Sequence, residues 1–87
     1  MSWSEAQRGK EMVKKIVGDI DGAIVCTILE PIGEDFEKGL YPVALKRGRN
    51  VFRLKIPMEE LERIDRNQAL RRRIRQRLER IIQKKVA

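Results

Sequence analysis

The N-terminal segment has the apolar periodicity of an amphipathic helix. From about residue 4 onward, its apolar side chains fall on one face of a helix with about 3.6 residues per turn: Ala6, Val13, Ile16, Val17 and Ile20. Two capping boxes fit the start of this pattern, Ser2 with Glu5 and Ser4 with Gln7. Gly18, followed by Asp21-Gly22, gives the stop and turn signal at its end. The sequence therefore predicts a helix over about residues 4–18.

Residues 23–29 form a nearly uninterrupted apolar run that is rich in β-branched side chains. Such a run is typical of a strand buried on both faces, so we expect this segment in the middle of a sheet. Pro31 ends the strand. Cys26 lies between apolar neighbours within the run, and we expect a buried and unreactive thiol at this position.

Two further strands are predicted after a loop over residues 32–41, which mixes acidic side chains with glycine and can hold one helical turn around Phe36. The strands cover residues 43–46 and 51–56. They are joined by Arg47-Gly48-Arg49-Asn50, a segment with the glycine and asparagine that a tight hairpin needs.

Alternation in the strand over residues 51–56 separates a core face from a solvent face. The core face consists of Phe52, Leu54 and Ile56. We expect it to pack against the apolar face of the first helix. The solvent face consists of Val51, Arg53 and Lys55.

The last third of the chain is predicted to be helical. Pro57 begins a helical stretch over residues 58–61, whose glutamates lie where the helix dipole favours them. Asp65 is a candidate cap for a helix that runs to about Val86. One apolar stripe follows this helix: Leu70, Ile74, Leu78, Ile81 and Ile82. The pattern leaves open whether residues 57–86 form one helix or two.

Together these elements predict a single small α+β domain over residues 1–87. The order is helix, three strands and a long basic C-terminal helix (αβββα), with an antiparallel sheet and helices packed on one side. The chain has 87 residues, 41% of them hydrophobic and 38% charged, which is enough apolar material for one core but too little for two.

Cellular location is predicted from what the sequence contains. The N-terminal residues lack the basic-then-apolar pattern of a signal peptide, and no apolar run approaches the length of a membrane span. The single cysteine excludes a disulfide within the chain. We therefore expect a cytoplasmic protein in a reducing compartment, with no membrane partner.

Charge is distributed unevenly along the chain. Residues 1–45 carry 5 basic and 8 acidic side chains, a net charge of −3, whereas residues 46–87 carry 15 basic and 5 acidic ones, a net charge of +10. The whole chain has a net charge of +7. This asymmetry indicates either a polyanionic partner or a basic surface whose role is solubility.

The residue types that carry catalysis are scarce. The chain has no histidine and only one cysteine, which removes the commonest general base and a cysteine-based metal site. Its acidic cluster, Glu30, Glu34, Asp35 and Glu37, lacks the ligand spacing of a calcium loop. We therefore expect a protein that is not an enzyme and has no cofactor, metal or small-molecule substrate.

Two groups of basic residues form the candidate nucleic-acid site. A helical projection places the first group in one narrow sector beside the apolar stripe: Arg66, Arg73, Arg77, Arg80 and Lys84. The second group lies on the hairpin and on the outward face of its strands: Lys46, Arg47, Arg49, Arg53 and Lys55. Arginine forks match phosphate geometry, so the sequence predicts contacts with the backbone of DNA or RNA without strong sequence choice.

The layout is similar to that of two families of nucleic-acid-binding proteins. Helix, three strands and a basic last helix resemble double-stranded-RNA-binding domains, although Arg71-Arg72-Arg73 stands where that family has a lysine-rich helix start. Residues 51–61 look like the strand-then-helix start of ribbon-helix-helix repressors. Here, however, the basic strand follows the first helix instead of opening the domain. Both resemblances concern layout alone.

The competing interpretation is a protein-interaction or homodimerisation domain. In that case the stripe residues Leu70, Ile74, Leu78 and Ile81 would pack against a second copy or a partner helix. Side-chain exposure separates the two interpretations. A continuous open basic surface favours nucleic acid, whereas pairing of these cations with Glu34, Asp35 and Glu37 favours self-association.

Overall fold

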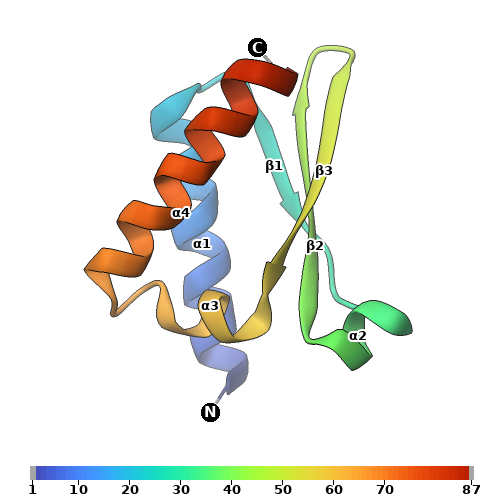
Figure 1. Ribbon diagram of the computed structural model, residues 1–87, viewed down its shortest axis with the longest axis vertical. Helices are drawn as coiled ribbons and strands as arrows, with labels where there is room; N and C mark the ends of the chain where they lie inside the picture. The colour runs from blue at the N-terminus through green and yellow to red at the C-terminus, as the bar shows by residue number, and fades with distance from the viewer. Residues whose placement is uncertain (1, 87) are drawn as a thin grey trace.

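The computed structural model describes the backbone of residues 2–86 and the side chains of residues 4–86. The elements follow in the order α1 (Ser2–Ile20), β1 (Val25–Ile28), α2 (Glu34–Lys38), β2 (Leu40–Arg47), β3 (Asn50–Pro57), α3 (Met58–Arg63), α4 (Gln68–Ile81) and the short π-helix η1 (Ile82–Val86) (Figure 1). The predicted α+β class and αβββα order are confirmed. The helical turn expected around Phe36 is α2. No helix in the described part of the chain is both long and apolar enough to cross a membrane.

The three strands form an antiparallel sheet in the order β1-β2-β3. The prediction for residues 23–29 is therefore wrong in one respect, because β1 is an edge strand and β2 is the central one. Outward side chains of β1, such as Val25 and Thr27, are exposed. The apolar run predicted that this segment is a strand. It did not predict the strand's place in the sheet, because that place depends on pairing with distant segments: β2 pairs with both β1 and β3.

The predicted hairpin is confirmed. Arg47 pairs with Asn50, which leaves Gly48 and Arg49 as a two-residue loop. Gly48 has a φ of 60°, whereas no non-glycine residue among those described has a positive φ. A positive φ at the first loop residue alone is the type II′ arrangement, whose twist matches that of the flanking strands.

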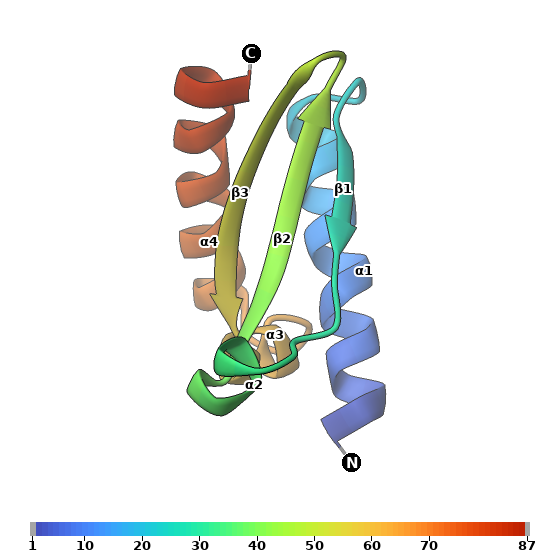
Figure 2. The ribbon, with the colours of Figure 1, turned by 90° about the vertical axis from the view of Figure 1, so that its right-hand side faces the viewer.

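Both long helices, α1 and α4, lie on the same face of the sheet, and Figure 2 shows the strands in front of them. The inward side chains of the sheet and the apolar faces of the two helices form one core. Leu54 and Ile56 are buried in this core together with Val13, Ile16 and Val17, as predicted, whereas Phe52 is only partly buried at its margin. The opposite face of the sheet has no long helix over it (Figure 2).

Residues 57–86 form separate helical segments. Leu61 and Ile64 are fully buried, so the chain turns inward after α3 before α4 begins. The predicted cap at Asp65 is wrong: Asn67 is the N-cap, and its Oδ1 accepts a hydrogen bond of 3.0 Å from the Leu70 amide. The first residue of α4, Gln68, directly follows this cap.

The helices α1 and α3 approach each other closely at Gly9. A Cβ atom at this position would lie 1.8 Å from the carbonyl oxygen of Leu61, a distance that no side chain tolerates. Gly9 therefore allows the two backbones to touch, which anchors α3 and the start of α4 beside α1.

Candidate nucleic-acid interface

Three arginines of α4, Arg73, Arg77 and Arg80, occupy the flank of the helix that faces the outer edge of β3. Leu70, Ile74 and Leu78 point into the core and orient the helix. Neighbouring positions on the β3 side are exposed, and we call four of them the basic ridge: Arg73, Arg77, Arg80 and Lys84. The Arg77 guanidinium donates a hydrogen bond of 3.3 Å to the main-chain carbonyl of Lys55. This contact places the basic ridge directly beside β3.

The C-terminal end of the helical segment also lies along β3. The side-chain amide of Asn50 donates to the Val86 carbonyl over 3.4 Å, and Val86 is buried. Two points of contact, one at Lys55 and one at Asn50, thus hold opposite ends of β3 to the helix. The ridge therefore runs parallel to the strand that carries Arg53 and Lys55.

The basic residues of the hairpin and its strands are exposed. Lys46, Arg53 and Lys55 point away from the core, and Arg47 and Arg49 lie at the turn. Their orientation follows from strand parity, because Leu45, Leu54 and Ile56 are the alternating inward residues.

Three of the ten predicted cations are paired with carboxylates. The ion pairs are Arg47 with Asp21 at 3.0 Å, Lys55 with Asp35 at 2.6 Å, and Arg66 with Glu5 at 2.6 Å. The hydrogen bond that the Lys55 ammonium donates to the Asp35 carboxylate raises the pKa of Lys55, which stays charged at neutral pH. All three pairs are partly solvent-exposed and contribute little to stability.

Arg66 does not belong to the basic ridge, contrary to the helical projection. It lies in the turn before α4, and its guanidinium reaches Glu5 of α1. The helical projection took Asp65 as the cap and therefore treated Arg66 as part of the helix. In the structure α4 begins at Gln68, so the projection does not apply to Arg66.

Seven predicted cations have no ion pair with any carboxylate of residues 4–86: Lys46, Arg49, Arg53, Arg73, Arg77, Arg80 and Lys84. Of the acidic loop around α2, only Asp35 pairs with a predicted site residue. Most of the positive charge on the β3 side of the molecule is therefore not neutralised by the described part of the chain.

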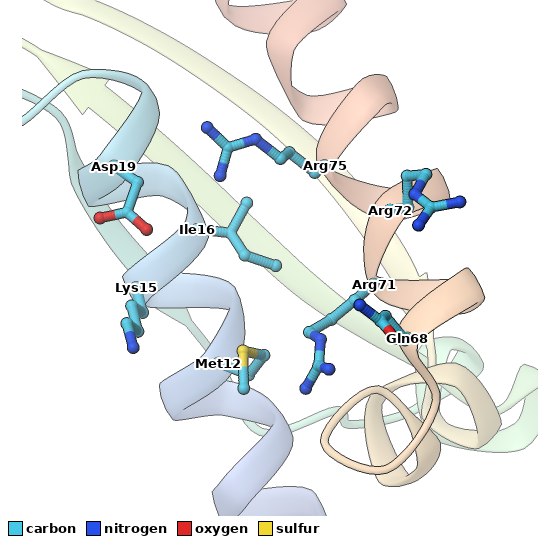
Figure 3. A pocket seen from close by; sticks show the side chains of 8 residues that line it. All are labelled: Met12, Lys15, Ile16, Asp19, Gln68, Arg71, Arg72 and Arg75. Carbon is cyan, nitrogen blue, oxygen red and sulfur yellow. The ribbon is translucent and has the colours of Figure 1, made fainter.

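A groove between α1 and α4 was missed by the sequence analysis. It has a volume of about 410 Å³ and is lined by Met12, Lys15, Ile16, Asp19, Gln68, Arg71, Arg72 and Arg75. Figure 3 shows Arg71 and Arg75 extending from α4 toward α1. The 3.6-residue period places both on the flank opposite the basic ridge, but only the packing of α1 beside α4 makes a groove there.

Two of the three arginines that line this groove, Arg71 and Arg75, make polar contacts within the protein. Arg71 donates a hydrogen bond of 3.1 Å to the Asp65 carbonyl, and the Arg75 guanidinium lies 3.6 Å from the Glu79 carboxylate, as the i,i+4 spacing predicts. Arg75 thus has a carboxylate partner, whereas no ridge cation has one among residues 4–86.

Cys26 is the single cysteine of the chain, and its thiol is free. It is only half-buried, so the prediction of a buried thiol is wrong, because β1 is an edge strand that pairs with β2 alone. Burial nevertheless raises the thiol pKa to about 11, with Lys14 opposing the shift. Among the described residues, no cluster of histidine, cysteine, aspartate or glutamate could hold a metal ion.

Comparison with known proteins gave no match among family models, curated proteins or solved structures.

Proposed function

We propose that this protein is a non-catalytic nucleic-acid-binding module that contacts the phosphate backbone of DNA or RNA. The observation that carries the proposal is the hydrogen bond from Arg77 to the Lys55 carbonyl. This bond joins the basic ridge of α4 to the basic residues of β3, which lie 22 residues apart in the sequence. The two groups that the sequence suggested separately thus border one another.

The length of the ridge suits a nucleic-acid strand. Arg73 and Lys84 are separated by 11 positions, which is roughly 16 Å along a helix at about 1.5 Å per residue. Phosphates follow each other at about 3.4 Å per strand along the duplex axis. The ridge therefore spans roughly five phosphates, enough for several simultaneous contacts.

The competing role of the apolar stripe has less support. Leu70, Ile74 and Leu78 are 4%, 4% and 0% exposed because they fill the protein's own core. Ile81 is also packed against that core. A dimer built on the stripe would have to unfold the domain first, whereas a nucleic-acid contact on the ridge requires no rearrangement.

The test compares two triple variants of equal charge. Arg73→Gln, Arg77→Gln and Arg80→Gln remove three ridge cations while keeping helix propensity. Lys15→Gln, Arg72→Gln and Arg75→Gln remove three cations from the α1–α4 groove as a matched control. Fluorescence anisotropy with labelled DNA and RNA at two or more salt concentrations measures both affinity and salt dependence.

We expect the ridge variant to bind all sequences more weakly and its logarithmic salt slope to shrink by roughly three units, about one for each lost contact. The groove variant should keep most of the slope. Thermal unfolding should show both variants folded, since the replaced side chains are largely exposed. Equal slopes in the two variants, or no binding by the parent protein at low salt, would refute the proposal.

We also propose a cytoplasmic location, on the basis of composition. The lone Cys26 cannot form a disulfide within the chain, which fits a reducing compartment. Fractionation of cells that produce the protein tests this, and recovery in a secreted or membrane fraction would contradict it.

A further inference from the structure

The outward face of the sheet is the least explained surface of the molecule. Strand register arranges its side chains in three rows across β1, β2 and β3: Val25, Lys46 and Val51; Thr27, Ala44 and Arg53; and Leu29, Pro42 and Lys55. The only described helix near this face is the short α2, at its lower end in Figure 2. Nine side chains thus lie on a largely uncovered surface.

In the two rows farther from the hairpin, uncharged side chains lie on the β1 and β2 side and basic ones on β3, whereas in the row next to the hairpin Lys46 lies between Val25 and Val51. Val25 and Leu29, on and just after β1, are 62% and 52% exposed, and Ala44 and Pro42 continue the apolar area onto β2. Arg53 and Lys55 occupy β3, on the side next to the basic ridge. Neighbouring strands lie about 4.8 Å apart, so the apolar edge is roughly 10 Å from the basic one.

The exposed apolar residues are concentrated in this part of the molecule. The large hydrophobic side chains that are exposed in the described structure are Val25, Leu29, Ile32, Phe36 and Val51. All of them belong to the outward face or to the segment that connects β1 to β2. Helices α1 and α4 contribute none, so the patch is local and not a general property of the surface.

A shallow hollow of about 340 Å³ lies where the apolar and basic areas meet. Its lining includes Leu29, Pro42 and Ala44 on one side and Arg53, Lys55 and Asp35 on the other. Its volume is within the range of small-ligand pockets. Phe36, the residue after Asp35, is 65% exposed and provides an aromatic ring on α2.

We infer that this face binds single-stranded nucleic acid, with phosphates on Arg53 and the basic ridge, whose cations have no carboxylate partner among the described residues, and with unstacked bases on the apolar area. The inference rests on the proposed function and adds the substrate class to it. An unpaired strand exposes both a charged backbone and flat apolar bases, so it complements both halves of the face.

Other occupants fit this face less well. A duplex encloses its bases, so it would place charged phosphates against Val25 and Leu29. Such a contact gains no binding energy from the apolar area. The nine side chains of this face include no carboxylate, so a second copy stacked on it would bury Lys46, Arg53 and Lys55 without supplying an acidic partner from the same face. A protein partner would need an acidic and apolar surface, and the experiment below distinguishes it.

The experiment measures the affinity of the parent protein for a labelled single strand of about 15 nucleotides and for a duplex of the same length. The duplex carries twice the charge, so electrostatics alone would favour it. We expect the single strand to bind about tenfold more tightly.

Two uncharged changes test the apolar area. Val25→Thr with Leu29→Thr removes apolar surface while keeping β-propensity, and Phe36→Ala removes the ring. Each should weaken single-strand binding about tenfold, with an unchanged salt slope and unchanged duplex binding. Phe36→Leu is the matched control for Phe36→Ala, because leucine keeps apolar bulk but has no aromatic ring. If bases stack on the ring, this variant should also lose most of the affinity that stacking contributes.

The outcomes separate this inference from the proposed function. Duplex binding that equals or exceeds single-strand binding, but still depends on the basic ridge, overturns the inference and leaves the proposed function standing. Absence of any nucleic-acid binding overturns both. Binding of an acidic amphipathic peptide that is lost in the Val25→Thr, Leu29→Thr variant, without single-strand affinity, assigns the face to a protein partner and also overturns the inference.

Discussion

At the scale of single residues, Cys26 and Gly9 show how neighbours determine the properties of a side chain. Cys26 points toward the core from an edge strand, so it is half-buried and its pKa is raised to about 11. Gly9 lies against the Leu61 carbonyl, so it has no room for a side chain. Both effects depend on residues distant in sequence.

The thiol of Cys26 should react slowly in the native protein. A pKa of about 11, two units above the ordinary value of 9.0, lowers the thiolate fraction at pH 8 on the order of 100-fold. Labelling rates at pH 8, with and without denaturant, measure this difference, and equal rates would contradict it. The folded pKa is the higher one, so the stability contributed by this thiol is complete below pH 9 and is lost as the pH rises toward 11.

Replacement of Gly9 by alanine should destabilise the protein. The new Cβ would overlap the Leu61 carbonyl, and α1 and α3 would have to move apart at a cost of about 1–3 kcal/mol. Gly18→Ala is the matched control in the same helix, because no atom lies within 4 Å of its added Cβ. Alanine there should stabilise the helix by up to about 1 kcal/mol. Urea denaturation of both variants measures the contrast, and similar effects would show that α1 and α3 do not touch as described.

At the scale of elements, the boundary of α4 is set by the turn that precedes it. The predicted cap Asp65 lies two positions before the observed cap Asn67, whose side chain accepts the hydrogen bond from the Leu70 amide. The start of α4 at Gln68 directs Arg73, Arg77 and Arg80 toward β3 and leaves Arg66 beside α1. The cap thus decides which arginines form the ridge.

Asn67→Ala should cost about 1 kcal/mol of folding stability, because the amide of Leu70 loses its side-chain acceptor. Asp65→Ala should change stability by less than about 0.5 kcal/mol, since its side chain caps no helix. Thermal unfolding of the two variants decides between the caps. A larger loss for Asp65→Ala would place the start of the helix at the earlier position.

At the scale of the whole molecule, the two faces of the sheet have different surroundings. The two long helices cover one face of the sheet, and the other face combines exposed apolar residues with cations. The basic ridge continues this charge around β3. We therefore expect one extended surface to determine two measurable properties. These are the reduced salt dependence of the ridge variant and the preference of the parent protein for single strands, and the titrations test both.

Much of this architecture follows from local patterns. The 3.6-residue period of Val13, Ile16 and Val17 predicted α1, and the alternation of Leu54 and Ile56 predicted the inward face of β3. Turn chemistry at Gly48 predicted the hairpin. These features depend on residues close together in the chain, for which periodicity and propensity are sufficient.

The sequence by itself thus determined the element types, the core stripes and the basic character of the C-terminal half. Only the tertiary structure decided that β1 is an edge strand, that Arg66 leaves the ridge, and that Arg77 meets β3 at Lys55. Local patterns report which face of an element is apolar. They do not report which neighbour covers that face, because this depends on packing between segments that are distant in the chain.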